Sequence, residues 1–204
     1  MESSSPTSQQ ILLIRHGETE WSRSGQHTGK TDIPLTDRGR TQAEALGRYL
    51  AARAANGNSR GLQVWTSPLG RARETATLAG LGDSAQMDMD LVEWNYGIYE
   101  GRTTADIQKT TPDWSVWHSP IIDGESLNQV AQRAGRVIHR VLAAAPDDVA
   151  LFAHGHILRI LASAWIALPP VSGRLLALDT ASVSVLGFER QTRVIRQWNV
   201  VPSA

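Results

Sequence analysis

Residues 11–17 read Ile-Leu-Leu-Ile-Arg-His-Gly. Four apolar side chains in succession predict a short strand that is buried on both faces, as in a parallel sheet. The run ends abruptly at Arg15 and His16, so a polar loop follows the carboxyl end of this strand. In open α/β sheets, ligands bind at that end of the strands. The stretch therefore predicts an α/β fold whose ligand site begins at Arg15.

Two further segments show a strand pattern followed directly by polar residues. Residues 62–65 and 149–152 predict strands, and the segments 66–73 (Thr-Ser-Pro-Leu-Gly-Arg-Ala-Arg) and 154–156 (His-Gly-His) follow them. The carboxyl ends of parallel strands meet at one edge of a sheet. All three polar segments are therefore expected to converge on one cleft.

Helical patterns separate the predicted strands. Thr36 is placed to cap a helix that runs to about residue 55, and Ser67-Pro68 is a typical helix start. Residues 126–145 place their apolar side chains on one stripe, and residues 157–168 also read as a helix. Residues 18–34 read as a long ordered loop. Strands that alternate with helices predict a three-layer α/β/α sandwich with a mostly parallel central sheet.

The chain has 204 residues, enough for one well-cored domain. Residues 182–188 and 194–200 alternate in polarity and are expected to complete the sheet. No repeat or linker interrupts the pattern. We therefore expect a single domain over residues 10–204, preceded by a flexible polar N-terminus at residues 1–9.

Composition excludes several classes of function. Lysine and arginine number 20, as do aspartate and glutamate, so no global field draws the chain to nucleic acid or to a membrane. Cysteine is absent, which excludes disulfides, thiolate catalysis and cysteine-ligated zinc. No apolar run has the length of a membrane span, and the N-terminus does not read as a signal peptide. We expect a cytoplasmic protein.

The side chains at the three strand ends suit a phosphate dianion. These side chains are Arg15 and His16 after the first strand, Arg71 after the second and His154 after the third. A guanidinium group offers a planar fork of donors that pairs with two phosphate oxygens at once. Helices that begin near Ser67 and Gly155 are expected to add backbone donors and a favourable dipole.

These motifs resemble those of the histidine phosphatase superfamily, which is also called phosphoglycerate-mutase-like. Residues 15–19 (Arg-His-Gly-Glu-Thr) resemble its Arg-His-Gly motif. Residues 66–76 (TSPLGRARETA) resemble its second arginine segment, residues 91–101 (LVEWNYGIYEG) its proton-donor segment, and residues 152–159 (FAHGHILR) its second histidine segment. The four motifs keep the family's order and are far more specific together than Arg-His-Gly alone.

The resemblance implies five catalytic residues, which are His16, Glu93, Arg15, Arg71 and His154. A neutral His16 nitrogen would attack phosphorus, and water would later hydrolyse the phosphohistidine. Arg15, Arg71 and His154 would stabilise charge on the equatorial oxygens, so no metal or other cofactor is expected. Glu93 would donate a proton to the leaving alkoxide and then act as a base for water. Asp90 and Glu100 compete with Glu93 for this role.

Five further residues are implied to bind phosphate or substrate, namely Ser22, Thr28, Gly29, Gly155 and His156. Many mutases of the family have asparagine where this chain has Ser22. His154 and His156 lack a third ligand at metal-binding spacing, so no metal site is expected. No role is expected for the other histidines, His27, His118 and His139.

Departures from the mutase pattern favour hydrolysis. Thr104 stands where the mutases are expected to have lysine, and the chain lacks their paired arginines and lid. Residues 25–36 (GQHTGKTDIPLT) resemble the sedoheptulose-bisphosphatase-like branch. Residues 112–117 (PDWSVW) with 124–127 (GESL) resemble bacterial acid phosphatases.

The implied partner is a small phosphorylated substrate, and the resemblance points to a sugar phosphate or bisphosphate. Aromatic side chains are expected to line its leaving-group side, namely Trp94, Tyr96, Trp114 and Trp117. Family analogy also allows a homodimer. Two alternatives stay open, a cofactor-dependent phosphoglycerate mutase and a catalytically silent phosphate-binding or scaffold module.

Overall fold

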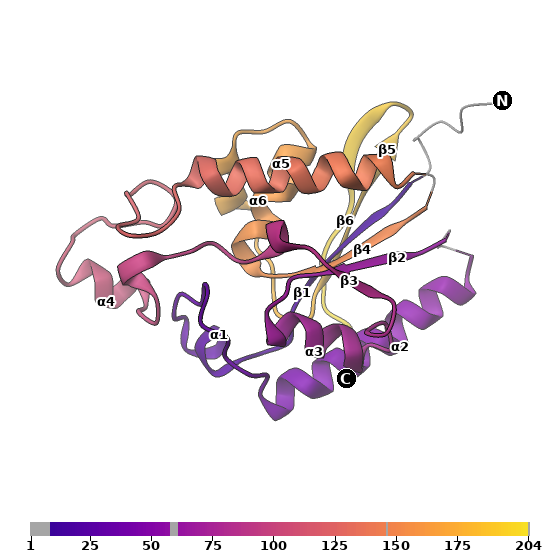
Figure 1. The fold of residues 1–204 in the computed structure, drawn as a ribbon, viewed down its shortest axis with the longest axis horizontal. Helices are drawn as coiled ribbons and strands as arrows, with labels where there is room; N and C mark the ends of the chain where they lie inside the picture. Colours follow the sequence, from indigo (N-terminus) through magenta and orange to yellow (C-terminus); the bar gives the residue numbers. More distant parts are fainter. Residues whose placement is uncertain (1–8, 58–60, 146, 204) are drawn as a thin grey trace.

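A six-stranded sheet in the order β3-β2-β4-β1-β5-β6 forms the centre of the molecule (Figure 1). The computed structural model describes residues 9–57, 61–145 and 147–203, so the expected flexible N-terminus lies outside the described residues except for Gln9. The strands are β1 (Ile11–Arg15), β2 (Gln63–Thr66), β3 (Ala85–Met87), β4 (Val149–Ala153), β5 (Val183–Glu189) and β6 (Thr192–Val200).

The direction of the strands matches the prediction. β1 and β2 both pair in parallel with β4, and β3 extends this parallel part beside β2. β5 runs antiparallel to β1, and β6 runs antiparallel to β5. The predicted α/β fold with a mostly parallel sheet is confirmed. The two segments expected to complete the sheet form its antiparallel edge.

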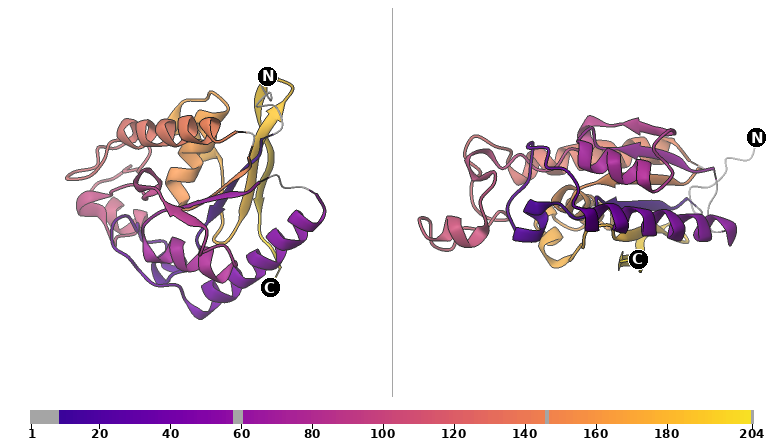
Figure 2. Two further views of the ribbon diagram at one scale, coloured as in Figure 1. Left: turned by 45° about the vertical axis from the view of Figure 1, so that its right-hand side comes forward. Right: turned by 90° about the horizontal axis from the view of Figure 1, so that it is seen from below.

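Helices cover both faces of the sheet (Figures 1 and 2). α2 (Asp37–Ala55) and α3 (Gly70–Leu78) lie on one face, and α5 (Leu127–Ala143) and α6 (Gly155–Trp165) lie on the other. Strand side chains alternate between the two faces. Accordingly, Leu12 packs in the cluster that includes Leu46 of α2, and Leu13 packs in the cluster that includes Val137 of α5. Burial of both strand faces explains the uninterrupted apolar run of β1.

Short elements occupy the long connections beyond the carboxyl ends of the strands. They are the helices α1 (Glu20–Ser24) and α4 (Thr104–Gln108) and the 3-10 turns η2 (Met89–Leu91), η3 (Gly97–Tyr99) and η4 (Pro170–Leu175). Figure 2 shows α1 and α4 together at one end of the molecule. These connections form the walls of the site described below.

Capping residues determine where the helices begin. Thr36 accepts a backbone N–H group at the start of α2, as the sequence predicted, and Ser126 does the same at the start of α5. The expected loop at residues 18–34 contains the short helix α1. A capping box between Thr19 and Ser22 stabilises the N-terminus of this helix. α3 begins at Gly70 rather than at Ser67, because Ser67 is buried and bonded elsewhere.

Candidate active site

Three adjacent strands deliver the predicted residues to one edge of the sheet. Arg15 is the last residue of β1 and lies opposite Ala153, the last residue of β4. His16 and His154 are therefore the first residues after two paired strands, and their ring centroids lie 5.2 Å apart. Ser67 follows β2 on the other side of β4. The expected convergence of the three strand ends is what the structure shows.

His16 is held as a neutral imidazole. Its Nδ1 lies 2.7 Å from the carbonyl oxygen of Gly17. A carbonyl can only accept, so Nδ1 carries the hydrogen and Nε2 keeps a lone pair. Burial, then the charges of Arg71 and Arg15, lower the pKa of His16 well below its ordinary value. The ring is thus in the form that a nucleophile at phosphorus requires.

Arg15 keeps part of its guanidinium available. Nη1 donates to the carbonyl oxygen of Leu178 at 2.5 Å, while the buried Nε has no protein partner. An unpaired buried N–H group is costly and is typical of a functional site. Arg15 therefore keeps one guanidinium N–H group without a protein partner next to His16.

Arg71 is fully buried, and its guanidinium is surrounded by acceptors. Nε donates to Nδ1 of His154 at 3.2 Å, and Nη1 donates to the carbonyl oxygen of Thr31 at 2.9 Å. Nη2 donates to the carbonyl oxygens of Gly29 and Thr28, at 3.0 and 3.2 Å. Arg71 thus fixes the loop that follows α1. Its positive charge lies close enough to His16 and His154 to lower the pKa of both rings.

His154 is an uncharged member of the cluster. Its Nδ1 accepts from Arg71, so the neutral ring carries its hydrogen on Nε2, which lies 2.8 Å from Oγ of Ser67. Burial, followed by the charges of Arg71, His16 and Arg15, lowers the pKa of His154 well below its ordinary value. The positive charge near the nucleophile therefore comes from the two arginines.

Glu93 faces the start of α6. The residue is 5% exposed. Its Oε1 accepts from the N–H groups of Trp94 and Ile157, at 2.9 and 3.0 Å. Oε2 accepts one N–H, that of His156, at 2.9 Å. The partial positive charge of a helix N-terminus favours an acidic group at this position. Oε2 has capacity for a further hydrogen bond or a proton.

The helix N-termini serve carboxylates rather than the open part of the site. His156 and Ile157 of α6 donate to Glu93, and the N–H of Gly70 in α3 donates to Asp32 at 2.5 Å. The expectation that both helix starts supply phosphate donors was wrong for these three amides. The charge of a nearby carboxylate satisfies them more strongly than a neutral acceptor would.

A cavity of about 170 Å³ lies between these side chains. It is lined by predicted catalytic and binding residues together with residues that sequence reasoning did not assign, which come from the loop after α1, from α6 and from the segment before β5. They are Arg15, His16, Ser22, Gly25, Gln26, His27, Thr28, Glu93, Tyr96, Gly155, His156, Arg159 and Leu178. A larger cavity of about 580 Å³ on the far side of Arg71 has no histidine among its lining residues.

Comparisons with known proteins agree with this geometry. The family model for the histidine phosphatase superfamily (branch 1) matches residues 11–201. The chain belongs to this superfamily. An acid phosphatase of Mycobacterium tuberculosis is 42% identical over 90% of this chain and 88% of its own length. A sedoheptulose 1,7-bisphosphatase of Saccharomyces cerevisiae is 36% identical over 77% of this chain and 67% of its own length.

A solved structure has the same fold. The product of an open reading frame of Mycobacterium tuberculosis superposes with a TM-score of 0.89 and 39% sequence identity, over 96% of this chain and 99% of that one. The resemblance inferred from four motifs is therefore confirmed over almost the whole chain. The protein is a phosphatase of the histidine phosphatase superfamily.

Sequence reasoning missed two cavity residues of this histidine phosphatase, His27 and Arg159, and gave Tyr96 only as part of an aromatic wall. His27 is buried, and burial, opposed by the charge of Glu100, lowers its pKa to about 4. The Tyr96 hydroxyl lies 2.6 Å from Nδ1 of His156. Arg159 follows Gly155 by four residues, so helical periodicity places both on one face of α6. That spacing is the signal that could have identified Arg159.

The predicted binding residues divide into two groups. Ser22, Thr28, Gly155 and His156 line the cavity, although the Ser22 hydroxyl is also used in the α1 capping box. Gly29 does not line it. Its N–H donates to Oε1 of Glu100 at 2.8 Å, and its carbonyl accepts from Arg71. A Cβ at Gly29 would lie 2.5 Å from a backbone oxygen, so the position requires glycine.

The competing carboxylates are engaged elsewhere. Glu100 accepts from the N–H groups of Gly29 and Thr31, and Asp90 pairs with Arg136 and Arg140. Neither carboxylate lines the 170 Å³ cavity. Among the three candidates, Glu93 alone does so, which agrees with its predicted role.

The expected aromatic wall is only partly present. Tyr96 lines the cavity, but Trp94 and Trp114 are buried in the core that faces α5 and α6. Trp117 stacks on the guanidinium of Arg159, with 4.8 Å between the ring centroid and the central carbon. The prediction was wrong for Trp94 and Trp114 because their large apolar rings are buried where they stabilise the fold.

The described part of this phosphatase shows no sign of a metal centre or of a membrane-spanning helix. It contains no cluster of three or more histidine, aspartate or glutamate side chains arranged to hold a metal ion. None of its helices combines the length and the apolar character that a membrane crossing requires.

Proposed function

We propose that the protein is a metal-independent phosphomonoester hydrolase that acts through a phosphohistidine at His16. The observation that carries this proposal is the neutral His16, which keeps a lone pair on Nε2 and lines one cavity together with Arg15 and Glu93. A neutral imidazole is a nucleophile, and the two other groups supply charge and a proton.

The first half-reaction forms a P–N bond and breaks a P–O bond. Nε2 of His16 attacks phosphorus while Nη and Nε groups of Arg15 stabilise the equatorial oxygens. Glu93, protonated at Oε2, transfers its proton to the leaving alkoxide. Oε2 is the better site for this proton because it accepts one N–H, whereas Oε1 accepts two.

The second half-reaction returns the enzyme to its starting form. Glu93 is now a carboxylate and removes a proton from water as the water oxygen attacks phosphorus. The P–N bond breaks, and the electron pair returns to Nε2 of His16. Phosphate leaves with its charge matched by Arg15, and Glu93 is again protonated.

A small sugar phosphate or bisphosphate is the substrate class we propose. The cavity is small, and it contains a second arginine, Arg159, in addition to Arg15. Nε of Arg159 donates to the carbonyl oxygen of Gly173 at 2.9 Å, which fixes the group beside the cavity. A fixed guanidinium suits a second anionic group on the substrate. The yeast relative's name supports a sugar bisphosphate.

One observation favours hydrolysis over mutase chemistry. The Thr104 hydroxyl lies 3.2 Å from Nε2 of His27, where a mutase is expected to place a lysine for a carboxylate. The mutase and the silent binding module remain alternatives that the experiment below separates. A cytoplasmic location and a homodimer stay predictions.

The proposal is tested by hydrolysis of an aryl phosphate in the presence of a metal chelator. The wild-type protein is expected to retain activity and His16→Asn to lose it, while His139→Asn, an exposed histidine on α5, is expected to match wild type. Loss of wild-type activity on adding chelator would contradict the metal-free mechanism. Inactivity of folded protein on a wide panel of phosphate esters would favour the binding module. Primer-dependent interconversion of phosphoglycerates would favour the mutase.

A further inference from the structure

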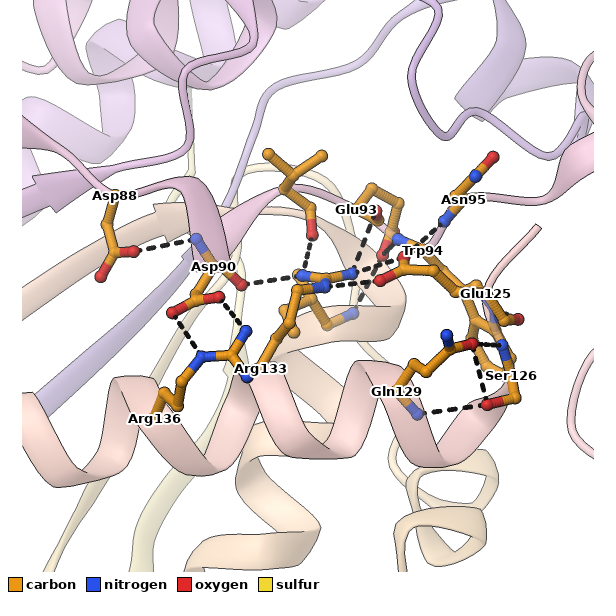
Figure 3. Close-up of polar contacts among 12 residues, drawn as sticks. Asp88, Asp90, Glu93, Trp94, Asn95, Glu125, Ser126, Gln129, Arg133 and Arg136 are labelled. Carbon is orange, nitrogen blue, oxygen red and sulfur yellow. Dashed lines mark hydrogen bonds and ion pairs between the residues drawn. The ribbon is translucent and has the colours of Figure 1, made fainter.

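Arg133 of α5 contacts the backbone of the segment that ends in Glu93. Its Nη1 donates to the carbonyl oxygens of Asp90 and Val92, at 2.8 and 2.7 Å. Nη2 lies 3.4 Å from the carbonyl oxygen of Glu93 itself. Figure 3 shows these contacts reaching from the helix to the segment above it, which contains η2 and Glu93. One guanidinium therefore binds three carbonyls within four residues.

Glu125 holds the same guanidinium from the other side. Nε and Nη2 of Arg133 each donate to one carboxylate oxygen of Glu125, both at 2.8 Å (Figure 3). Glu125 also accepts the N–H of Asn95 at 3.0 Å, and its carbonyl accepts the indole N–H of Trp94 at 2.7 Å. The pair thus contacts the chain on both sides of Glu93.

The pair is largely withdrawn from solvent and ionised. The side chains of Arg133 and Glu125 are 12% and 23% exposed. Burial alone would raise the pKa of Glu125, but hydrogen bonds from Arg133 and Asn95, with the charges of Arg133 and Lys30, outweigh it and lower the pKa. Bidentate geometry makes this ion pair stronger and more directional than a surface pair.

Glu93 is consequently fixed at both ends. Its carboxylate accepts N–H groups of His156 and Ile157 in α6, and its backbone is held from α5 by Arg133. Proton transfer requires hydrogen-bond distances between the acid and the leaving oxygen. Small displacements at a reacting group cost large factors in rate.

We propose that Arg133 is a positioning residue for proton transfer by Glu93. It does not line the cavity, so it does not touch the substrate. Its guanidinium sets where the Glu93 backbone lies and thereby where Oε2 meets the leaving group. This inference rests on the proposed function of Glu93 as the proton donor.

Leaving groups distinguish a positioning role from a purely structural one. An alkoxide needs the proton from Glu93, whereas 2,4-dinitrophenolate leaves without it. We would compare kcat/KM for glycerol 2-phosphate and 2,4-dinitrophenyl phosphate in wild type, Arg133→Met and Arg133→Lys. The matched control is Arg136→Met, because Arg136 lies one turn further along α5, is 55% exposed and binds the Asp90 side chain rather than the backbone near Glu93.

Both Arg133 variants are expected to lose at least about 10-fold more on the alkyl ester than on the aryl ester, since general acid catalysis contributes about 10²-fold or more. Arg133→Lys keeps the charge but lacks the planar fork, so it tests the geometry if Arg133→Met does not fold. Arg136→Met should leave the ratio unchanged. Equal losses on both esters, or no loss in folded Arg133→Lys, would overturn the proposal. Failure of the proposed function would appear separately, because the His16→Asn variant would then keep the activity of wild type.

Discussion

At the scale of single residues, the reactivity of the site depends on where charge is available. His16 and His154 are neutral, because burial and neighbouring arginines lower the pKa of both rings. Arg71 donates to His154 and to loop carbonyls, while Arg15 retains a buried Nε without a protein partner. Under the proposed mechanism, Arg15 is therefore the arginine expected to bind the phosphate, while Arg71 orders the loop and His154 around it.

Arg159 is expected to control preference for substrates with a second anionic group. Arg159→Gln should reduce kcat/KM for a sugar bisphosphate by about 10-fold or more, the size of one lost charge-assisted hydrogen bond. The matched sugar monophosphate should change less than about 3-fold. Arg174→Gln, an exposed arginine in η4, is the control and should change neither substrate. Equal losses on both sugars in Arg159→Gln would show that Arg159 does not recognise a second anion.

At the scale of elements, the loop that carries His16 packs closely against the first turn of α2. The carbonyl of Gly39 faces Gly17, and the backbone of Glu18 faces Gly39, with no room for a Cβ at either glycine. The hydroxyl of Thr36, the N-cap of α2, accepts the N–H of Gly39 and donates to Oε1 of Glu18. The start of α2 thus holds the loop that carries His16 in place.

Gly39→Ala is expected to separate α2 from this loop. Its Cβ would collide with the Glu18 backbone, so we expect a stability loss of about 1–3 kcal/mol and reduced kcat. Gly135→Ala in α5 is the control, because its Cβ would meet no atom within 4 Å. That variant should be neutral or stabilised by up to about 1 kcal/mol. Thermal and urea unfolding measure both, and an unchanged Gly39→Ala would contradict the close packing.

Elements with a clear local signal could be predicted from the sequence. The apolar run of β1, the Thr36 cap of α2 and the Ser126 cap of α5 are local features, and each marks its element correctly. β3 (Ala85–Met87) could not be predicted, because it has only three residues and their polarity shows no strand pattern. Only pairing with β2 makes these residues a strand. The start of α3 was displaced because Ser67 bonds His154, 87 positions away.

The site shows the same division between local and distant information. His16, Glu93 and His154 stand in motifs, so their positions could be read from the chain. The bonds of Arg133 to the Glu93 segment join residues about 40 positions apart. No local pattern records such contacts, since they arise only when α5 packs on the sheet.

At the scale of the whole molecule, buried neutral histidines make stability depend on pH. The pKa values of His16, His27, His154 and His156 are all lowered, with burial as the largest cause. The unfolded chain binds protons at these rings near pH 6.5, whereas the folded chain does not. Unfolding is therefore favoured progressively as the pH falls below 6.5.

His27 allows this dependence to be measured. With a folded pKa of about 4, its ring costs about 2 kcal/mol of stability at pH 5 relative to pH 7. His27→Gln should remove about that much of the pH dependence of the free energy of unfolding in urea. His118→Gln serves as the control. A His27→Gln variant with the same pH dependence as wild type would contradict the buried neutral ring.

The covalent role of His16 is tested most directly by trapping the intermediate. Wild-type protein mixed with a ³²P-labelled substrate and quenched in alkali should carry label that is stable to base, labile to acid and located by mass spectrometry on the peptide containing His16. When the labelled substrate is 2,4-dinitrophenyl phosphate, whose leaving group needs no proton, Glu93→Gln slows only water activation and should accumulate more label than wild type, and His16→Asn should carry none. Label on another residue, or turnover with no base-stable label in either wild type or Glu93→Gln, would contradict the mechanism.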